Sequence, residues 1–298
     1  DGLLWPLFLA FWLVRAPLGS LLDSLSMQAA NFSAALYSRV RLTGSVGFIV
    51  VSCVVGWARV GTSPARFFAC LVLLTGLTFA VTPLLPTAPP RPPAPRDAPG
   101  FWQSLPPPFG CWLLAMMLHW FAFSPYQYGF TLLLAEERVP ESLMGVVWSL
   151  GVGAEVAAFF ASPWVFTRFS SRRVLFWALS ASGVRWLLLG LWPTLPVILL
   201  TQLLHGPGFA LYYAAALQTL HAFGRGRFAA SYQGLYASCV GGLAGVLGTA
   251  LGGALHAHMP FHRVLLCMVP VQALSLLLLY AAHLDAPRRD DAACSPLA

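Results

Sequence analysis

Long apolar stretches follow one another along this chain, and they restrict it to a fold that lies within a membrane. About nine stretches come close to the roughly 20 residues that a helix needs to cross a bilayer. Their approximate ranges are 3–30, 43–60, 65–85, 109–134, 142–166, 172–192, 195–219, 229–256 and 262–283. Only helices and closed barrels span lipid, and the alternating segments of roughly ten residues that mark a barrel are absent from the sequence. We therefore predict an all-α membrane protein with about nine transmembrane helices.

The composition excludes a water-soluble domain. Apolar residues make up 58% of the 298 residues and charged residues only 9%, whereas a soluble domain carries about 25% charged residues. The net charge of +7 comes from 17 arginines and no lysine, and the arginines are spread over short loops. A nucleic-acid-binding surface would gather them on one element, so we expect them to set the membrane topology and expect no nucleic-acid partner.

The arginines are distributed unevenly between the two sets of loops. Eleven lie in one set and four in the other, and the positive-inside rule places the richer set in the cytoplasm. We therefore expect a multi-pass protein of the plasma membrane, acting as a monomer, with a cytoplasmic C-terminal tail at 286–298.

A proline-rich segment divides the apolar stretches into two groups. Residues 86–108 read PTAPPRPPAPRDAPGFWQSLPPP, and proline at this density favours an extended linker over a helix. This cytoplasmic linker separates a partial bundle, 1–85, from a six-helix bundle, 109–285. The chain opens on Asp1, has no targeting segment before its first apolar stretch and contains an odd number of stretches, so we interpret it as lacking its beginning.

Three consecutive apolar stretches of the six-helix group each carry one ionisable residue near the middle. These residues are Glu155 in MGVVWSLGVGAEVAAFFASPWVF, Arg185 in VLFWALSASGVRWLLLGLW and His205 in LPVILLTQLLHGPGFALYYAAALQ. A charge at the bilayer centre costs about 2.5–3.5 kcal/mol on insertion scales, so such residues usually face a polar cavity or a partner. An acid, a fixed cation and an imidazole on consecutive helices predict a pathway for a solute and protons.

Each of these three residues has a chemical reason to serve in transport and a structural alternative. Burial disfavours the ionised form of Glu155 and a nearby arginine favours it, so movement of Arg185 or of substrate would load and release a proton. Arg185 keeps its charge and presents a fork of donors that suits a carboxylate. His205 can bind substrate or relay a proton. The alternatives are a static ion pair between Glu155 and Arg185, and a purely structural His205.

One further polar residue and several aromatic residues could contribute to the same site. Gln202, in the stretch of His205, joins the candidate substrate-binding residues. The aromatic residues that could line a pocket are Tyr126, Tyr128, Trp148, Tyr212 and Tyr213. Tyrosine and tryptophan also gather at membrane interfaces, and that explains most of them.

The sequence argues against an enzyme and against a metal site. An intramembrane enzyme would need a nucleophile beside a general base, or metal ligands at helical spacing. Neither Glu155 nor His205 has such a neighbour in the sequence. The loop histidines His256, His258 and His262 lack an acidic or thiol companion, so we expect no metal and no cofactor. An intramembrane enzyme and a non-transporting fragment remain as alternatives from another class.

These features resemble a known superfamily. Six apolar stretches after a long linker are similar to the C-terminal half of a twelve-helix major facilitator transporter, and the three before it would correspond to its helices four to six. YSRVRLTGSVGF at 37–48 resembles the start of helix five in the lactose permease-like oligosaccharide–proton symporters. VVWSLGVGAEVAAF, GVRW and QLLHG look even closer to the 3-phenylpropionic acid transporter family. The resemblance implies a major facilitator-type bundle that lacks its first three helices.

The resemblance also implies roles for individual residues. Asp23 and Arg41 stand where lactose permease-like symporters have a substrate-binding acid and arginine, and Phe48 stands where they stack a tryptophan on the sugar. The helix-eight acid, helix-nine arginine and helix-ten histidine of the proton and substrate site correspond to Glu155, Arg185 and His205. Gly208 takes the place of a further helix-ten glutamate, so coupling would need another proton carrier.

We therefore predict a secondary transporter that couples protons to a small organic solute by alternating access. An aromatic carboxylic acid such as phenylpropionate fits the resemblance best, and a nucleoside or sugar is the alternative within the class. The predicted proton-coupling residues are Glu155, Arg185 and His205. The predicted substrate-binding residues are Asp23, Arg41, Phe48, Arg185, His205 and Gln202.

Overall fold

The computed structural model describes residues 22, 25–26, 34–57, 63–84, 100–224 and 228–282, and the regular structure within them is helical. In chain order the helices are α2 (Ala34–Trp57), α3 (Pro64–Val81), α4 (Pro107–Glu136), α5 (Glu141–Arg168), α6 (Ser171–Leu191), α7 (Leu195–Gln202), η4 (Gly206–Leu211), α8 (Tyr212–Phe223), α9 (Ala229–Tyr236), η5 (Ala237–Ala244), α10 (Gly245–His256) and α11 (Phe261–Ala281). Short 3-10 turns are η2 (Thr82–Leu84) and η3 (Trp102–Ser104). The predicted all-α fold is confirmed.

Six helical segments of the described residues are long and apolar enough to cross a bilayer. They are Pro64–Leu84, Leu143–Arg168, Ser171–Leu191, Leu195–Phe223, Ser231–His256 and Phe261–Ala281. The fourth joins α7, η4 and α8, and the fifth contains η5, so each of these two has a π-helical piece in its middle. Of the first predicted stretch, 3–30, only residues 22, 25 and 26 are among those described.

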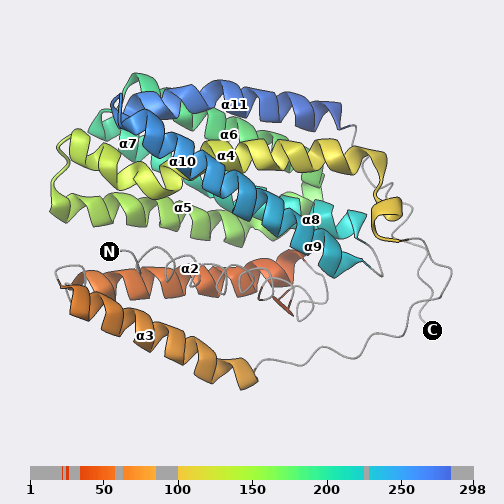
Figure 1. Cartoon of the computed structure of the whole chain (residues 1–298), viewed down its shortest axis with the longest axis horizontal. Helices are drawn as coiled ribbons and strands as arrows, with labels where there is room; N and C mark the ends of the chain where they lie inside the picture. The colour runs from red at the N-terminus through yellow and green to blue at the C-terminus, as the bar shows by residue number, and fades with distance from the viewer. Residues whose placement is uncertain are drawn as a thin grey trace, which may run out of the picture.

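The helices from α4 to α11 pack into one bundle around α4 and α6 (Figure 1). α4 packs against α10, η5 and α11, and α6 packs against α11, η4 and α8. α5 packs on η4 and α7, and α2 lies along α5. α3 follows beyond α2 in Figure 1, and none of its 18 residues, all of which are described, is buried. The described residues of the N-terminal part therefore meet the bundle mainly through α2.

A proline in α4 and glycines in α10 allow these two helices to approach closely. Pro125 has no N–H for the carbonyl of Phe121, four residues before it. Gly248 of α10 lies against that carbonyl, and a side chain at Gly248 would clash with the backbone of Phe121. Gly252, one turn later, lies against Pro125 itself, where an added Cβ would come within 2.8 Å of the ring. The glycines of α10 are thus spaced to lie against the part of α4 where Pro125 leaves a backbone hydrogen bond unmade.

Aromatic side chains fill two buried clusters of the bundle. The cluster nearer the start of α4 contains Phe109, Trp112, Tyr212, Tyr232 and Tyr236. The other cluster contains Phe123, Tyr126, Phe130, Trp186 and Phe261. Trp120 packs against both clusters, so the aromatic core is continuous along α4.

Candidate functional site

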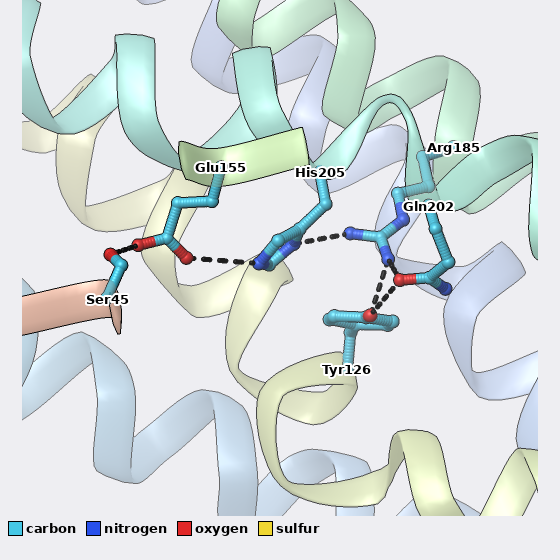
Figure 2. A network of polar contacts seen from close by, with 6 residues as sticks. All are labelled: Ser45, Tyr126, Glu155, Arg185, Gln202 and His205. Carbon is cyan, nitrogen blue, oxygen red and sulfur yellow. Dashed lines mark hydrogen bonds and ion pairs between the residues drawn. The ribbon is translucent and has the colours of Figure 1, made fainter. Parts of the chain in front are cut away.

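A polar network connects α2, α4, α5, α6 and the junction between α7 and η4 (Figure 2). Its six members are Ser45, Tyr126, Glu155, Arg185, Gln202 and His205. The structure therefore brings together four residues that the sequence singled out, namely Glu155, Arg185, Gln202 and His205.

Two glycines bring α5 and the α7–η4 junction close enough to form this network. Gly206, which follows the histidine, packs against the backbone carbonyl of Ala154, which precedes the glutamate, and a side chain at Gly206 would clash there. One turn earlier in α5, Gly151 leaves room for the side chain of Gln202, whose Oε1 would lie 2.5 Å from an added Cβ. The close approach of the two helices places the acid and the imidazole side by side.

Glu155 connects α2 to the bundle. The hydroxyl of Ser45 donates a hydrogen bond to Oε1 of Glu155 at 2.7 Å, and Nε2 of His205 lies 3.8 Å from Oε2. Ser45 is 6% exposed, whereas residues 46–48 after it are exposed. The carboxylate therefore lies at the boundary between α2 and the bundle, in contact with both.

Arg185 lies deeper in the bundle and is 1% exposed. Its Nη1 donates to Nδ1 of His205 at 2.9 Å, and its Nη2 donates to Oε1 of Gln202 at 3.0 Å and to the hydroxyl of Tyr126. The guanidinium carbon also lies 3.9 Å from the centroid of the Tyr126 ring, within the range of a cation–π contact. Within the described part of the chain, the groups that bond to this buried cation are all neutral.

The partners of His205 determine which of its nitrogens carries a proton. A guanidinium can only donate hydrogen bonds, so the Nδ1 that faces Arg185 accepts and is unprotonated. The proton of the neutral ring is therefore on Nε2, which faces the carboxylate of Glu155. The imidazole thus links the two charged groups, because it accepts from the cation and donates toward the acid.

Two buried donors on Arg185 and Gln202, which bond to each other, have no hydrogen-bond partner among the described residues. They are Nε of Arg185 and Nε2 of Gln202. A buried donor left unpaired costs about 1–3 kcal/mol. A ligand rich in acceptors, such as a carboxylate, has the chemistry to satisfy both.

The other predicted site residues lie apart from this network or outside the described residues. Asp23 is not described, and of Arg41 only the backbone, within α2, is described. Phe48 is on α2 and is 57% exposed. Sequence reasoning missed Ser45, although it lies four residues after Arg41 and three before Phe48. That spacing puts all three on one face of a helix and is the signal that would have found it.

The position of Gly208 is closely packed. An added Cβ there would lie 2.7 Å from Oγ of Ser182 in α6. The bundle as packed has no space at this position for a side chain as large as glutamate.

One of the three loop histidines, His256, does have an acidic companion, so the expectation that all three lack one is wrong. Nδ1 of His256 lies 3.6 Å from Oε1 of Glu136, and Oε2 of Glu136 accepts from the N–H of Phe261 at 2.8 Å. The ends of α4 and α10 meet the start of α11 at this point, which the sequence order conceals. The described residues nevertheless contain no group of three His, Cys, Asp or Glu side chains suited to a metal ion.

Comparisons with known proteins relate this chain to membrane transporters. The sequence model of the MFS_1 like family matches residues 3–266. The chain is 27% identical over 268 residues to "Probable 3-phenylpropionic acid transporter" of Escherichia coli (strain K12), covering 84% of this chain and 67% of the relative. It is 28% identical over 236 residues to "Maltose permease" of Geobacillus stearothermophilus, covering 78% of this chain and 59% of the relative. The matched region thus spans part of each relative's length.

Proposed function

Because the chain belongs to the MFS_1 like family and is a multi-pass membrane transporter rather than an enzyme, we propose that it moves a small organic acid across the plasma membrane together with a proton. One observation carries this proposal. Arg185 is buried among neutral partners, and the acid Glu155 lies on the other side of His205. Transport would proceed by alternating access, with two bundles rocking around a site near the bilayer midplane.

The charges of the network favour binding of a proton and an anion together. With Glu155 ionised, the network contains one negative and one positive side chain. Protonation of Glu155 removes the negative charge and leaves Arg185 as an uncompensated buried cation, which is costly. A substrate carboxylate would neutralise Arg185, whose planar fork matches two carboxylate oxygens. Each ligand therefore raises the affinity for the other, which is the thermodynamic basis of symport.

The aromatic surroundings of Arg185 support a substrate with an aromatic body. The ring of Tyr126 lies 5.1 Å from that of Trp186 and 5.8 Å from that of Phe123, measured between centroids. Phe209 stacks on the ring of His205 at 5.5 Å. The name of one relative includes 3-phenylpropionic acid, which combines a carboxylate with an aromatic ring. A neutral nucleoside or sugar is the alternative, since another relative is a maltose permease.

We also propose how the chain is organised in the membrane. Residues 1–85 would belong to one rocking bundle and 109–285 to the other, joined by a cytoplasmic linker at 86–108. The tail at 286–298 would be cytoplasmic, since the positive-inside rule places it there. The hydrogen bond between Ser45 of α2 and Glu155 of α5 supports this division, since the proposed coupling acid would then lie at the boundary between the bundles. Asp23, Arg41 and Phe48 would supply substrate contacts from the first bundle, and the protein would act as a monomer.

The variant Glu155→Gln tests the proposal. It removes the titratable group and leaves an amide that can still hydrogen-bond to Ser45 and His205. In proteoliposomes with an inward proton gradient, we expect accumulation of labelled 3-phenylpropionate to fall at least about tenfold, a typical size for a coupling between two ligands. Exchange of labelled for unlabelled substrate needs no net proton movement and should continue.

The matched control is Glu137→Gln, the same chemical change at a half-buried acid outside the network, next to the end of α4. It should leave both accumulation and exchange unchanged. Unaltered accumulation in Glu155→Gln would overturn the assignment of Glu155 as proton carrier. Proton-driven accumulation of maltose or a nucleoside instead of 3-phenylpropionate would support the alternative substrate class.

A further inference from the structure

A second buried polar cluster lies in the same bundle and has no part in the transport cycle proposed above. Nδ1 of His119 in α4 is 3.1 Å from Oε1 of Gln272 in α11, and Nε2 of Gln272 donates to the carbonyl of Leu179 in α6 at 3.0 Å. The ring of Tyr212 lies 4.3 Å from that of His119, and its hydroxyl is 2.9 Å from the hydroxyl of Tyr236. All these side chains are buried.

The two clusters share α4, α6 and the helix formed by α7, η4 and α8. His119 lies seven residues before Tyr126 on α4, and Tyr212 lies seven residues after His205 on the helix formed by α7, η4 and α8. Seven residues are close to two turns of an α-helix, so His119 and Tyr126 share a face of α4 and are separated by about 10 Å along it. The π-helical η4 lies between His205 and Tyr212. α4 runs opposite to the helix of α7 and α8 in Figure 1. Both displacements therefore point to the end where α4 begins, the end proposed to be cytoplasmic.

The amide of Gln272 determines where the proton of His119 lies. The carbonyl of Leu179 can only accept, so Gln272 presents its N–H to Leu179 and its oxygen to His119. Nδ1 of the neutral ring must then carry the proton, and Nε2 keeps a lone pair. Nε2 is buried and has no hydrogen-bond partner among the described residues. Burying a polar atom without a hydrogen bond costs about 1–3 kcal/mol of stability. A native protein that keeps such an atom usually has a reason for it, such as a functional role.

The groups that face His119 within the described chain are uncharged. α11 presents Gln272, whose amide also donates to the Leu179 carbonyl of α6, and α8 presents Tyr212 with Tyr236 of α9 behind it. The two phenols are the titratable members of this set, and a phenol ionises near pH 10 when unperturbed. An imidazole has an unperturbed pKa of about 6.5. Within this cluster, His119 is therefore the group that binds and releases a proton more readily than the two phenols.

We propose that His119 is a second proton-binding residue of the transport cycle, occupied between release from the Glu155–His205 pair and release to the cytoplasm. This inference rests on the proposed proton symport. Nε2 of the neutral ring gains the proton and a positive charge, while the donor becomes a carboxylate or a neutral imidazole. Loss of the proton to the cytoplasm then restores neutral His119. Among the described residues, the buried carboxyl and imidazole groups are Glu155, His205 and His119.

The ring of Phe123 separates the two sites in this conformation. Its centroid is 5.9 Å from that of His119 and 6.0 Å from that of His205. Along α4 it comes one turn after His119 and one turn before Tyr126, so it lies between the clusters. A proton would pass only after α4 and η4 shift against each other. The π-helical η4 starts directly after His205, and such segments often occur at functional sites.

The variant His119→Asn tests this proposal because it keeps a donor for Gln272 and removes the basic Nε2. In proteoliposomes, we expect exchange of 3-phenylpropionate to stay within about twofold of wild type. We expect proton-driven net uptake to fall about tenfold or more and to lose part of its pH dependence, because a proton-transfer group has been removed. The exposed His258→Asn is the matched control and should change neither quantity.

A second variant covers the case in which His119→Asn does not fold. Gln272→Glu keeps an acceptor at Nδ1 and places a carboxylate beside the ring, which favours its charged form. The pH dependence of net uptake should then move to higher pH by about one unit. A purely structural histidine would produce no such shift.

The outcomes are distinct. If both variants keep the wild-type pH profile and accumulation while Glu155→Gln loses accumulation, the role of His119 is overturned and the proposed symport stands. If the wild-type protein shows no proton-driven uptake, the symport and the role of His119 both fail.

Discussion

α3 and α4 differ in burial, and the difference is the opposite of what their apolar composition would suggest. α3 is one of the segments apolar enough to cross a bilayer, yet none of its 18 residues, all described, is buried. α4 has 30 residues, includes Pro125 and His119 and is not among those segments, yet 14 of its residues are buried. Between these two helices, apolarity therefore does not predict burial: the exposed helix is α3, and the helix around which others pack is α4, which contains polar and aromatic residues. Helix packing in lipid depends on close contacts and polar pairs rather than on apolarity.

The largest predicted effect comes from one substitution made on both helices. Phe109 of α4 is 2% exposed, and its ring lies 5.3 Å from that of Phe223 and 4.9 Å from that of Tyr232. Phe109→Ala should lower the free energy of unfolding by about 3 kcal/mol, the lower end of the range for a buried aromatic residue. Phe79 of α3 is 80% exposed, and Phe79→Ala should change it by about 0.5 kcal/mol or less. Unfolding of the purified protein in detergent measures both values.

Similar losses at the two positions would contradict the comparison. A loss of about 3 kcal/mol at Phe79 would mean that another part of the protein covers α3. A negligible loss at Phe109 would mean that the aromatic cluster near the start of α4 closes around the space left by the ring.

The positions of the described helices were largely predictable from the sequence, and the exceptions have physical causes. α2 begins at Ala34 rather than near 43 because Arg39 and Arg41 lower the apolarity of its first turns without ending the helix. α4 was predicted at 109–134 and extends over Pro107–Glu136. The π-helical pieces η4 and η5 were not predicted, since they depend on how α5 and α4 pack against those glycine-containing segments.

A smaller effect is expected from the close contact between α10 and α4. Gly248→Ala would place a methyl group against the backbone of Phe121, which cannot move without bending α4. We expect a loss of about 2 kcal/mol, in the range for an overpacked core. Gly253→Ala on the same helix is the matched control, because nothing lies within 4 Å of its added Cβ. Thermal unfolding in detergent distinguishes the two, and equal stability would show that α10 does not rest on α4 at this point.

The sequence predicted which charged residues and which histidine form the candidate site, but not which of them contact one another. Glu155, Arg185 and His205 were identified because an ionisable residue inside an apolar helix is costly unless it has a function. The order of contacts, with His205 between the two charges, depends on the rotation of each helix about its axis. These helices are apolar on all sides, so the sequence does not reveal that rotation. Tyr126 was one of five aromatic residues named as possible pocket residues, most of which were explained by the membrane interface, and the sequence did not reveal that it lies beside Arg185.

The smallest expected effect concerns a glycine of α3 and tests whether this helix is as open as the comparison implies. Nothing lies within 4 Å of a Cβ added at Gly76. Gly76→Ala should therefore stabilise the protein slightly, by about 0.5 kcal/mol, because alanine favours a helix more than glycine does. Detergent unfolding against wild type measures the change. A loss of stability would mean that Gly76 serves close packing. In that event, the contrast between an open α3 and a closely packed α4 would be wrong.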